Sequence, residues 1–264
     1  MEQTYTCSEL ESGYYSYLLL TRRVVGVKLY EDKATFHAID LPHRKGKASY
    51  CQMIKMASAG KVVKAANDNF ACDTSARVIG LRPYYEEDEG IQGWEDSGLY
   101  ASRKEATTLH ETVQPVEQTT VGIVTGPLSK LPHAPDIIMM PCTPYQAMRI
   151  VQGYTYHYGF KKDIKMSGQC GVCFESTSLP LREQDLSISL LCSGTRFICK
   201  WPEDTMMVAF PYAMASTILD GIAKTAQGCE PDTYKHRIMK RLYHHKFKFI
   251  EKLDDGKAYF YKGT

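Results

Sequence analysis

The sequence predicts a single domain, residues 1–264, of the α/β or α+β class, with a mixed β-sheet flanked by helices. Short β-branched runs alternate with helical patterns of about 10–15 residues, which is typical of these classes. The chain of 264 residues is long enough to bury one substantial core. Its hydrophobic content of 44% and charged content of 23% are ordinary for a globular protein.

Five short apolar runs predict the strands of the sheet. They are residues 24–30, 119–125, 136–140, 186–191 and 206–210. A further short strand is expected at residues 61–66. Lys28 interrupts the first run, either as a cation that faces a bound ligand or, more simply, as a strand residue whose ammonium group reaches water.

Helical periodicity and capping residues predict the helices. The expected helices are residues 8–22, 49–60, 102–113, 143–156 and 212–227, with a last, basic helix from residue 231. Ser49 is a suitable N-cap with Gly60 as the stop, and Thr143 is a suitable N-cap before Pro144. Residues 31–47 are expected to be a loop, and a hairpin is expected at residues 254–257.

The acidic segment at residues 83–98 contains several glycines and predicts a solvated loop or a mobile lid. The basic helix near the C-terminus predicts a solvated face or a site for weak anion binding.

Composition narrows the choice of partners and compartment. The net charge of +2 gives no reason to expect a nucleic-acid partner. We see no signal peptide, and no apolar run approaches the roughly 20 residues needed to span a membrane. We therefore expect a cytoplasmic protein without disulfides, in which the nine cysteines are buried thiols, metal ligands or reactive thiols.

Four cysteines and three glycines lie in residues 168–201. They are Cys170, Cys173, Cys192 and Cys199, with Gly168, Gly171 and Gly194. We expect these glycines to let the backbone approach a bound cofactor. The C-x₂-C formed by Cys170 and Cys173 stands alone, which argues against a zinc finger. Gly168 and Gly171 also oppose the helix that a thioredoxin-like dithiol requires. Iron–sulfur clusters tolerate irregular spacing and favour amide-rich surroundings.

Three other features carry possible chemistry. Cys51 is expected in the first turn of a helix, where the dipole lowers a thiol pKa. Cys72 precedes another short helix. Cys192 is followed closely by Gly194 and Arg196, so that a thiolate could lie beside a guanidinium group. Motifs typical of serine hydrolases, nucleotide-binding proteins and metalloproteases do not occur.

These features together resemble an uncharacterised archaeal-type, cysteine-rich family, domain of unknown function 169. The likeness covers residues 20–225 and leaves a C-terminal basic helix and hairpin at residues 230–264 outside it. The shared pattern comprises Cys51, Cys72, Cys170, Cys192, Gly194, Arg196 and the motif from Pro144 to Arg149. Such proteins are found mostly in archaea and anaerobic bacteria.

On this basis we expect Cys51, Cys72, Cys170 and Cys192 to converge on an iron–sulfur cluster, most simply a [4Fe–4S] cluster. The cluster would serve electron transfer or small-substrate redox chemistry, with a small molecule or a redox protein as partner. Cys173 and Cys199 should point elsewhere or lie outside the ligand set. One alternative is a metal-free thiol enzyme or sulfur carrier, in which Cys192 is catalytic and Arg196 lowers its pKa. Another is a non-catalytic module that binds a cofactor or a protein.

Overall fold

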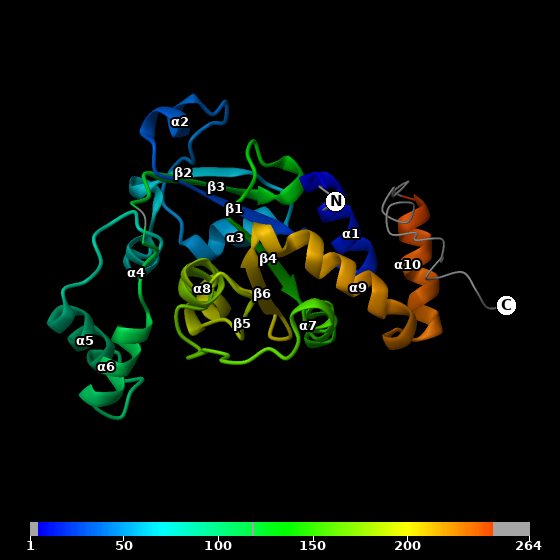
Figure 1. Ribbon diagram of the computed structural model, residues 1–264. Coiled ribbons are helices and arrows are strands. Elements are labelled where there is room, and N and C mark those ends of the chain that lie inside the picture. The colour runs from blue at the N-terminus through cyan, green and yellow to red at the C-terminus, as the bar shows by residue number, and fades with distance from the viewer. Residues whose placement is uncertain (1–4, 118, 245–264) are drawn as a thin grey trace.

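The computed structural model describes residues 5–117 and 119–244, and within them the strands form one six-stranded sheet in the order β2-β3-β1-β4-β6-β5 (Figure 1). The strands are β1 (Val25–Tyr30), β2 (Val63–Ala66), β3 (Gly122–Pro127), β4 (Ile137–Cys142), β5 (Ser187–Ser189) and β6 (Met206–Pro211). Every paired neighbour in this sheet is antiparallel. The predicted class, helices around one sheet, is confirmed, and the sheet is antiparallel rather than mixed.

Helices cover the sheet and its edges (Figure 1). The α-helices are α1 (Cys7–Tyr17), α2 (Lys33–Ala38), α3 (Tyr50–Ser58), α4 (Asp73–Val78), α5 (Glu87–Asp96), α6 (Arg103–Thr112), α7 (Pro144–Tyr158), α8 (Leu179–Glu183), α9 (Ala215–Cys229) and α10 (Asp232–His244). Ser49 and Thr143 cap α3 and α7 as predicted, and each forms a reciprocal capping box with a glutamine three residues later. Residues 31–47, expected to be a loop, contain the short helix α2.

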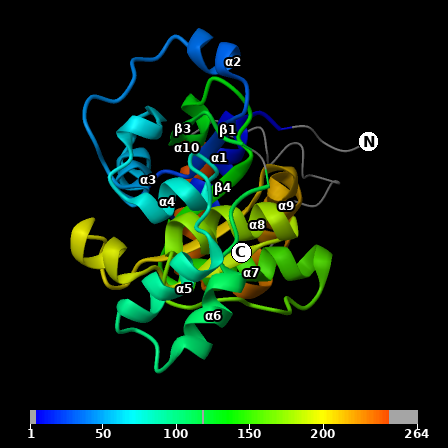
Figure 2. The same cartoon turned by 90° about the vertical axis from the view of Figure 1, so that its left-hand side faces the viewer.

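Most of the acidic segment is a helix, so its prediction as a solvated loop was wrong. Residues Glu87, Asp88 and Glu89 occupy the first turn of α5, where negative charge is favourable beside the positive end of the helix dipole. Ile91 is buried, and Arg103 of α6 pairs with Asp88 at 2.8 Å. Figures 1 and 2 show α5 and α6 together at one end of the molecule, opposite α2.

The alternation of side chains along the strands divides the core into two parts. Ile137 and Met139 of β4 pack with α3 and α4 on one face, whereas Ile138 and Met140 pack with α1, α7 and α9 on the other. This division follows from the two-residue period of a strand. Six of the cysteines lie on or beside the first face, as described below.

Helices α7 and α9 are held together by glycines and a buried ion pair. A Cβ atom on Gly221 would lie 2.1 Å from the carbonyl oxygen of Gly153, so only glycine permits this close approach. Arg149 Nε lies 2.6 Å from Glu230 Oε1, and both side chains are almost fully buried. Arg149 also donates to Ile222 O at 3.0 Å. The Pro144–Arg149 motif therefore has a structural role in the fold.

The basic helix docks through an apolar stripe. Ile238 and Leu242 of α10 are fully buried, and Arg241 donates to the carbonyl oxygens of Tyr15 and Leu20 at 2.8 and 3.0 Å. The hairpin expected at residues 254–257 lies outside the described residues. Across residues 5–117 and 119–244, no helix is long and apolar enough to cross a membrane.

The Arg149–Glu230 pair gives a test of this packing. Replacing Arg149 by Met leaves a buried carboxylate unpaired, so we expect a loss of about 3–5 kcal/mol in the free energy of unfolding. Urea denaturation measures this loss.

The double variant Arg149→Met/Glu230→Met should recover most of the loss. Lys165→Met, which breaks the surface pair with Glu183, should cost no more than about 1 kcal/mol. An equal cost for Arg149→Met and Lys165→Met would contradict the assignment.

Candidate functional site

The site is built around a π-helical segment, η3 (Gly171–Ser178). The residue before it, Cys170, has a left-handed backbone conformation with φ of 53°. The expectation that the glycines would prevent a helix here was wrong. A Cβ atom on Gly171 would lie 2.6 Å from the Cα atom of Leu191, so glycine at this position allows the start of η3 to contact the segment that follows β5 and leads to Cys192. π-Helical turns often occur at functional sites.

Cys192 receives several hydrogen bonds at its sulfur. The thiol of Cys51 is the strongest donor, and the Thr195 hydroxyl, at 3.0 Å, and the backbone N–H groups of Gly171 and Thr195 add to it. Although burial opposes ionisation, these donors lower the pKa of Cys192 to about 5. Cys192 is only partly buried. A thiol with this pKa is largely ionised at neutral pH.

Cys51 and Cys199 complete a group of three sulfurs, which we call the Cys192 trio. Cys51 hydrogen-bonds to both Cys192 and Cys199, and its own pKa is raised well above the usual range by these two bonds and by burial. The helix N-terminus was expected to lower the pKa of Cys51. That expectation was wrong, because Cys51 is the proton donor shared by two more acidic neighbours.

Cys199 is the second acidic thiol of the trio. Its pKa is lowered to about 7 chiefly by the hydrogen bond from Cys51, against the effect of burial, with help from the Ser49 hydroxyl at 3.3 Å and the nearby charge of Lys55. Lys55 is held in place because its Nζ donates to the carbonyl oxygens of Cys199 and Lys200 at 2.6 and 2.7 Å. Cys199 therefore lies beside Cys51, and its expected place outside a ligand set stays a prediction.

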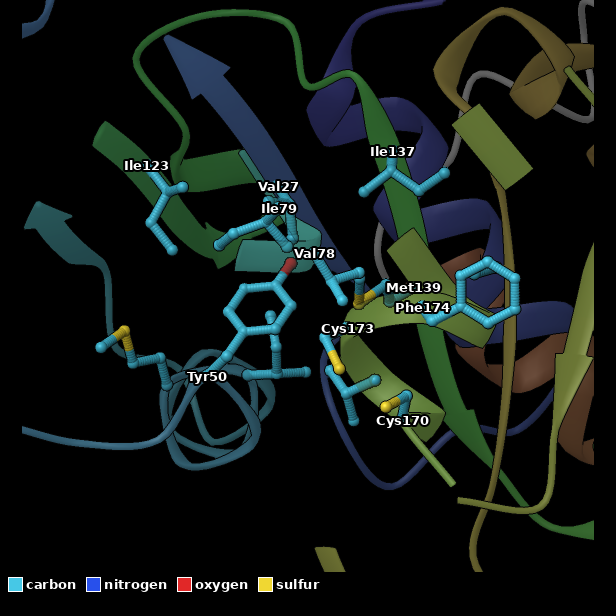
Figure 3. Packing of buried hydrophobic residues seen from close by; sticks show 14 of the residues in the cluster. Val27, Tyr50, Val78, Ile79, Ile123, Ile137, Met139, Cys170, Cys173 and Phe174 are labelled. Carbon is cyan, nitrogen blue, oxygen red and sulfur yellow. The ribbon is translucent and has the colours of Figure 1, made fainter. Parts of the chain in front are cut away.

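A second group of cysteines adjoins the trio at the start of η3. Figure 3 shows Cys170 and Cys173 in the same packed cluster as the buried ring of Tyr50. Cys173 hydrogen-bonds to Cys170, and its pKa is raised well above the usual range first by this bond, then by burial and by the charges of Cys170, Cys72 and Cys192. Cys173 therefore lies next to Cys170, which agrees with its expected place beside, but not within, the predicted ligand set.

The other predicted site residues have separate roles. Gly168 donates its N–H to Glu175 at 3.3 Å, and a Cβ atom on Gly194 would touch only the sulfur of Cys192. Arg196 does not face the thiolate: its guanidinium donates to the carbonyl oxygens of Leu190 and Thr205 at 2.8 and 2.6 Å and to that of Pro202. Arg196 therefore shapes the loop around Cys192.

Lys28 lies on a different part of the sheet from the cysteines. Its Nζ is 2.6 Å from Asp136 Oδ1, and it lines a pocket with Tyr30 and His133. Its strand neighbours Val27 and Leu29 point into the core that contains Cys170 and Cys173, so Lys28 points to the opposite face. The structure does not bring Lys28 to the cysteines.

Glu175 is a buried residue that the sequence analysis missed. Its carboxylate has no ion-pair partner among the described residues, and burial raises its pKa. It accepts hydrogen bonds from Ser167 N at 2.8 Å and from Ser189 Oγ at 2.5 Å. Ser189 Oγ in turn accepts from Leu191 N at 2.9 Å. Glu175 thus ties η3 to the segment before Cys192. The signal in the sequence that could have indicated Glu175 is the polar run from Glu175 to Ser178. In the structure this run is completely buried.

The cysteines are also the residues that could bind a metal. Six thiols gather here and are suitable ligands for soft metals: Cys51, Cys72, Cys170, Cys173, Cys192 and Cys199. In the part of the chain that the structure describes, no group of three or more His, Cys, Asp or Glu side chains is placed to hold one metal ion. The arrangement as it stands therefore does not fit a mononuclear site.

Together, the fold and the site define a cysteine-rich α+β protein with an activated thiol. The chain belongs to the family domain of unknown function 169, described as uncharacterised ArCR, whose sequence profile matches residues 15–221. This confirms the resemblance. An uncharacterised protein of Methanocaldococcus jannaschii is 25% identical over 211 residues, which cover 78% of this chain and 88% of that protein. No solved structure matches the chain.

The Cys192 environment predicts a pH dependence of alkylation. The thiolate reacts and the thiol does not, so the rate at Cys192 should rise with pH through its pKa of about 5 and then reach a plateau. Thr195→Val removes one donor to the thiolate. Because such a bond contributes about 1.5–3 kcal/mol, we expect the midpoint to move about 1–2 pH units higher.

Iodoacetamide labelling of the Cys192 peptide, followed by mass spectrometry at a series of pH values, measures this midpoint. Thr155→Val is the matched control, because the Thr155 hydroxyl bonds only within its own helix, to Gln152 O at 3.2 Å. A Thr195→Val midpoint equal to that of Thr155→Val would refute the role given to Thr195.

Proposed function

We propose that this protein is a thiol-dependent redox protein that reduces disulfide-containing substrates, with Cys192 as the attacking thiolate. One observation carries the proposal: Cys192 is only partly buried, and hydrogen bonds link the thiol of Cys51 both to Cys192, whose pKa they lower, and to Cys199. A lone nucleophile needs no such neighbours. A pair that forms and releases a disulfide does need a resolving thiol.

The proposed reaction has three steps. The Cys192 thiolate attacks one sulfur of the substrate disulfide, so that a mixed disulfide forms and the other substrate sulfur leaves as a thiolate. Cys51 then passes its proton to the Cys199 thiolate, to which it is hydrogen-bonded. Finally the Cys51 thiolate attacks the Cys192 sulfur, which releases the second substrate thiolate. The substrate gains two electrons, and the protein is left with a Cys51–Cys192 disulfide, to be reduced by an external dithiol.

The surroundings of Cys192 support a substrate with apolar groups. Phe197 and Ile198, in the second π-helical turn η4 (Gly194–Ile198), are 76% and 67% exposed, and Leu190 is 53% exposed. Exposed apolar side chains beside a reactive group are typical of surfaces that contact a partner or substrate.

Replacing each of the three thiols should affect a different step of the reaction. With hydroxyethyl disulfide as the substrate, Cys192→Ser should abolish reduction, because the attacking sulfur is lost. Cys51→Ser should accumulate the mixed disulfide on Cys192, because the resolving thiol is missing. Cys199→Ser should slow the resolving step without abolishing it. Rapid acid quenching and intact-protein mass spectrometry identify each species.

Cys142→Ser is the control for this experiment. Cys142 is buried at the end of β4 on the other face of the sheet, and burial raises its pKa to about 12. It should not affect the reaction. The proposal is refuted if Cys192→Ser retains full activity, or if Cys51→Ser traps no mixed disulfide.

An iron–sulfur cluster is the second candidate, and the gathering of six thiols favours it. Cys51, Cys72, Cys170 and Cys192 would hold a [4Fe–4S] cluster, which takes four cysteine ligands and supplies one-electron transfer when bound. The cysteine ligands of a cluster bind different iron atoms and need not surround a single ion. The lack of a single-ion site among the described residues therefore argues against a mononuclear metal more strongly than against a cluster. Backbone N–H donors, such as that of Gly171, suit cluster sulfurs and thiolates alike.

Metal analysis separates the two candidates. If a cluster is present, protein purified without oxygen should be brown and should contain iron and sulfide. Serine at any of the four ligand positions should then lower the iron content, whereas Cys7→Ser and Cys229→Ser should not. Colourless protein without iron, sulfide or zinc would exclude the cluster and leave the thiol proposal standing.

A further inference from the structure

The segment of residues 190–205, which we call the Cys192 loop, presents three apolar side chains to solvent. They are Leu190, Phe197 and Ile198, and each is more than half exposed. A small molecule is usually bound in a concave site that covers most of its surface. Side chains that project into solvent do not form such a site, but they can pack against a larger partner. The Cys192 loop therefore suits a polypeptide better than a small disulfide.

Two cations fix the backbone of the Cys192 loop. The guanidinium group of Arg196 donates to Leu190 O at 2.8 Å and to Thr205 O at 2.6 Å, which joins the two ends of the loop. Lys55 of α3 donates to two more carbonyl oxygens of the loop, at 2.6 and 2.7 Å. Because these bonds already order the backbone, a partner does not have to order it on binding. The loop thus presents its apolar side chains on a preformed surface.

The backbone is strained at two positions of the same loop. Leu191 has φ of 68° and Lys200 has φ of 56°, values that residues other than glycine rarely adopt. Such conformations cost free energy and cluster at functional sites, where the surrounding structure holds them. Cys192, Phe197 and Ile198 all lie between these two positions. The strain is therefore a second indication, independent of exposure, that this segment has a function.

We propose that the substrates of Cys192 are polypeptides in which apolar residues flank the reactive disulfide, and that Leu190, Phe197 and Ile198 determine this specificity. The specificity rests on the proposed function, since the same thiolate attacks the substrate and the bond changes at sulfur are those given above. The three side chains lie within six residues of Cys192 in one loop. They pack against the residues on either side of the substrate cysteine.

Two neutral peptides of equal length test this specificity. They are acetyl-Leu-Cys-Leu-amide and acetyl-Ser-Cys-Ser-amide, each joined through its cysteine to mercaptoethanol in a mixed disulfide. Hydroxyethyl disulfide is the reference without a peptide. Acid quenching and chromatography measure the second-order rate constant of reduction by the fully reduced protein, without added dithiol. We expect the leucine peptide to react about tenfold faster than the serine peptide, because its side chains remove apolar surface from water at the loop.

Phe197→Ser should slow the leucine peptide about fivefold to tenfold and leave the serine peptide and hydroxyethyl disulfide unchanged. Phe160→Ser is the matched control, because Phe160 is 83% exposed, close to the 76% of Phe197, and lies outside the Cys192 loop. Leu190→Ser repeats the comparison at a second position, with the similarly exposed Leu99→Ser as its control. The proposal is overturned if the two peptides react equally, or if both loop variants behave like their controls.

Binding to Cys192→Ser tests the surface when no reaction can occur. Saturation-transfer NMR should show tighter binding of the leucine peptide than of the serine peptide. Phe197→Ser in the same background should remove most of this difference. Equal binding of the two peptides would overturn the proposal whether or not the unaltered protein reduces disulfides. Selective binding, together with no reduction of hydroxyethyl disulfide by the unaltered protein, would refute the proposed function while it supports the peptide-binding surface.

Discussion

The close contact of two backbone segments at Gly171 and Leu191 is the constraint on which the site depends. Because residue 171 has no side chain, its N–H reaches the sulfur of Cys192, which follows Leu191 directly. Glu175 holds the same two segments together through Ser189. A buried carboxylate without a cation is costly unless it is fully hydrogen-bonded. The backbone and serine donors around Glu175 meet that requirement, so the polar run in η3 is part of the framework of the cysteine site.

Local signals in the sequence were sufficient for most of the fold. The capping boxes at Ser49 and Thr143 depend on residues three positions apart, and strand β4 is a continuous apolar run. The acidic helix α5 was missed because its charges suggested a solvated loop, whereas they stabilise a helix N-terminus. Strand β5 is shorter than predicted because the chain turns at Leu191, whose φ is 68°. A positive φ is typical of glycine and not of leucine, so the sequence does not indicate a turn at Leu191.

The sequence was sufficient to predict which residue types form the site, but not which groups contact each cysteine sulfur. The cysteines were recognised, yet the lowering of the Cys192 pKa was assigned to Arg196, because a nearby guanidinium is the simplest cause of an acidic thiol; in the structure, Cys51 and Thr195 lower that pKa. Which group faces a sulfur depends on tertiary contacts: Cys51 and Cys199 are far apart in the chain and meet only because α3 packs against η4. In the same way, the sequence did not show which face of the sheet the Lys28 side chain occupies, because that depends on the orientation of strand β1 in the folded sheet.

The single proton shared within the trio has an electrostatic consequence. As the pH rises through about 7, Cys199 loses its proton while Cys192 is already ionised, and the proton on Cys51 remains between two anions. Lys55 is the cation identified beside them, and it is bound to backbone carbonyls. The surroundings of the trio therefore become more negative as the pH rises through about 7. Anionic molecules are repelled there and cationic ones are attracted, to a degree that weakens as salt screens the field beyond about 8 Å.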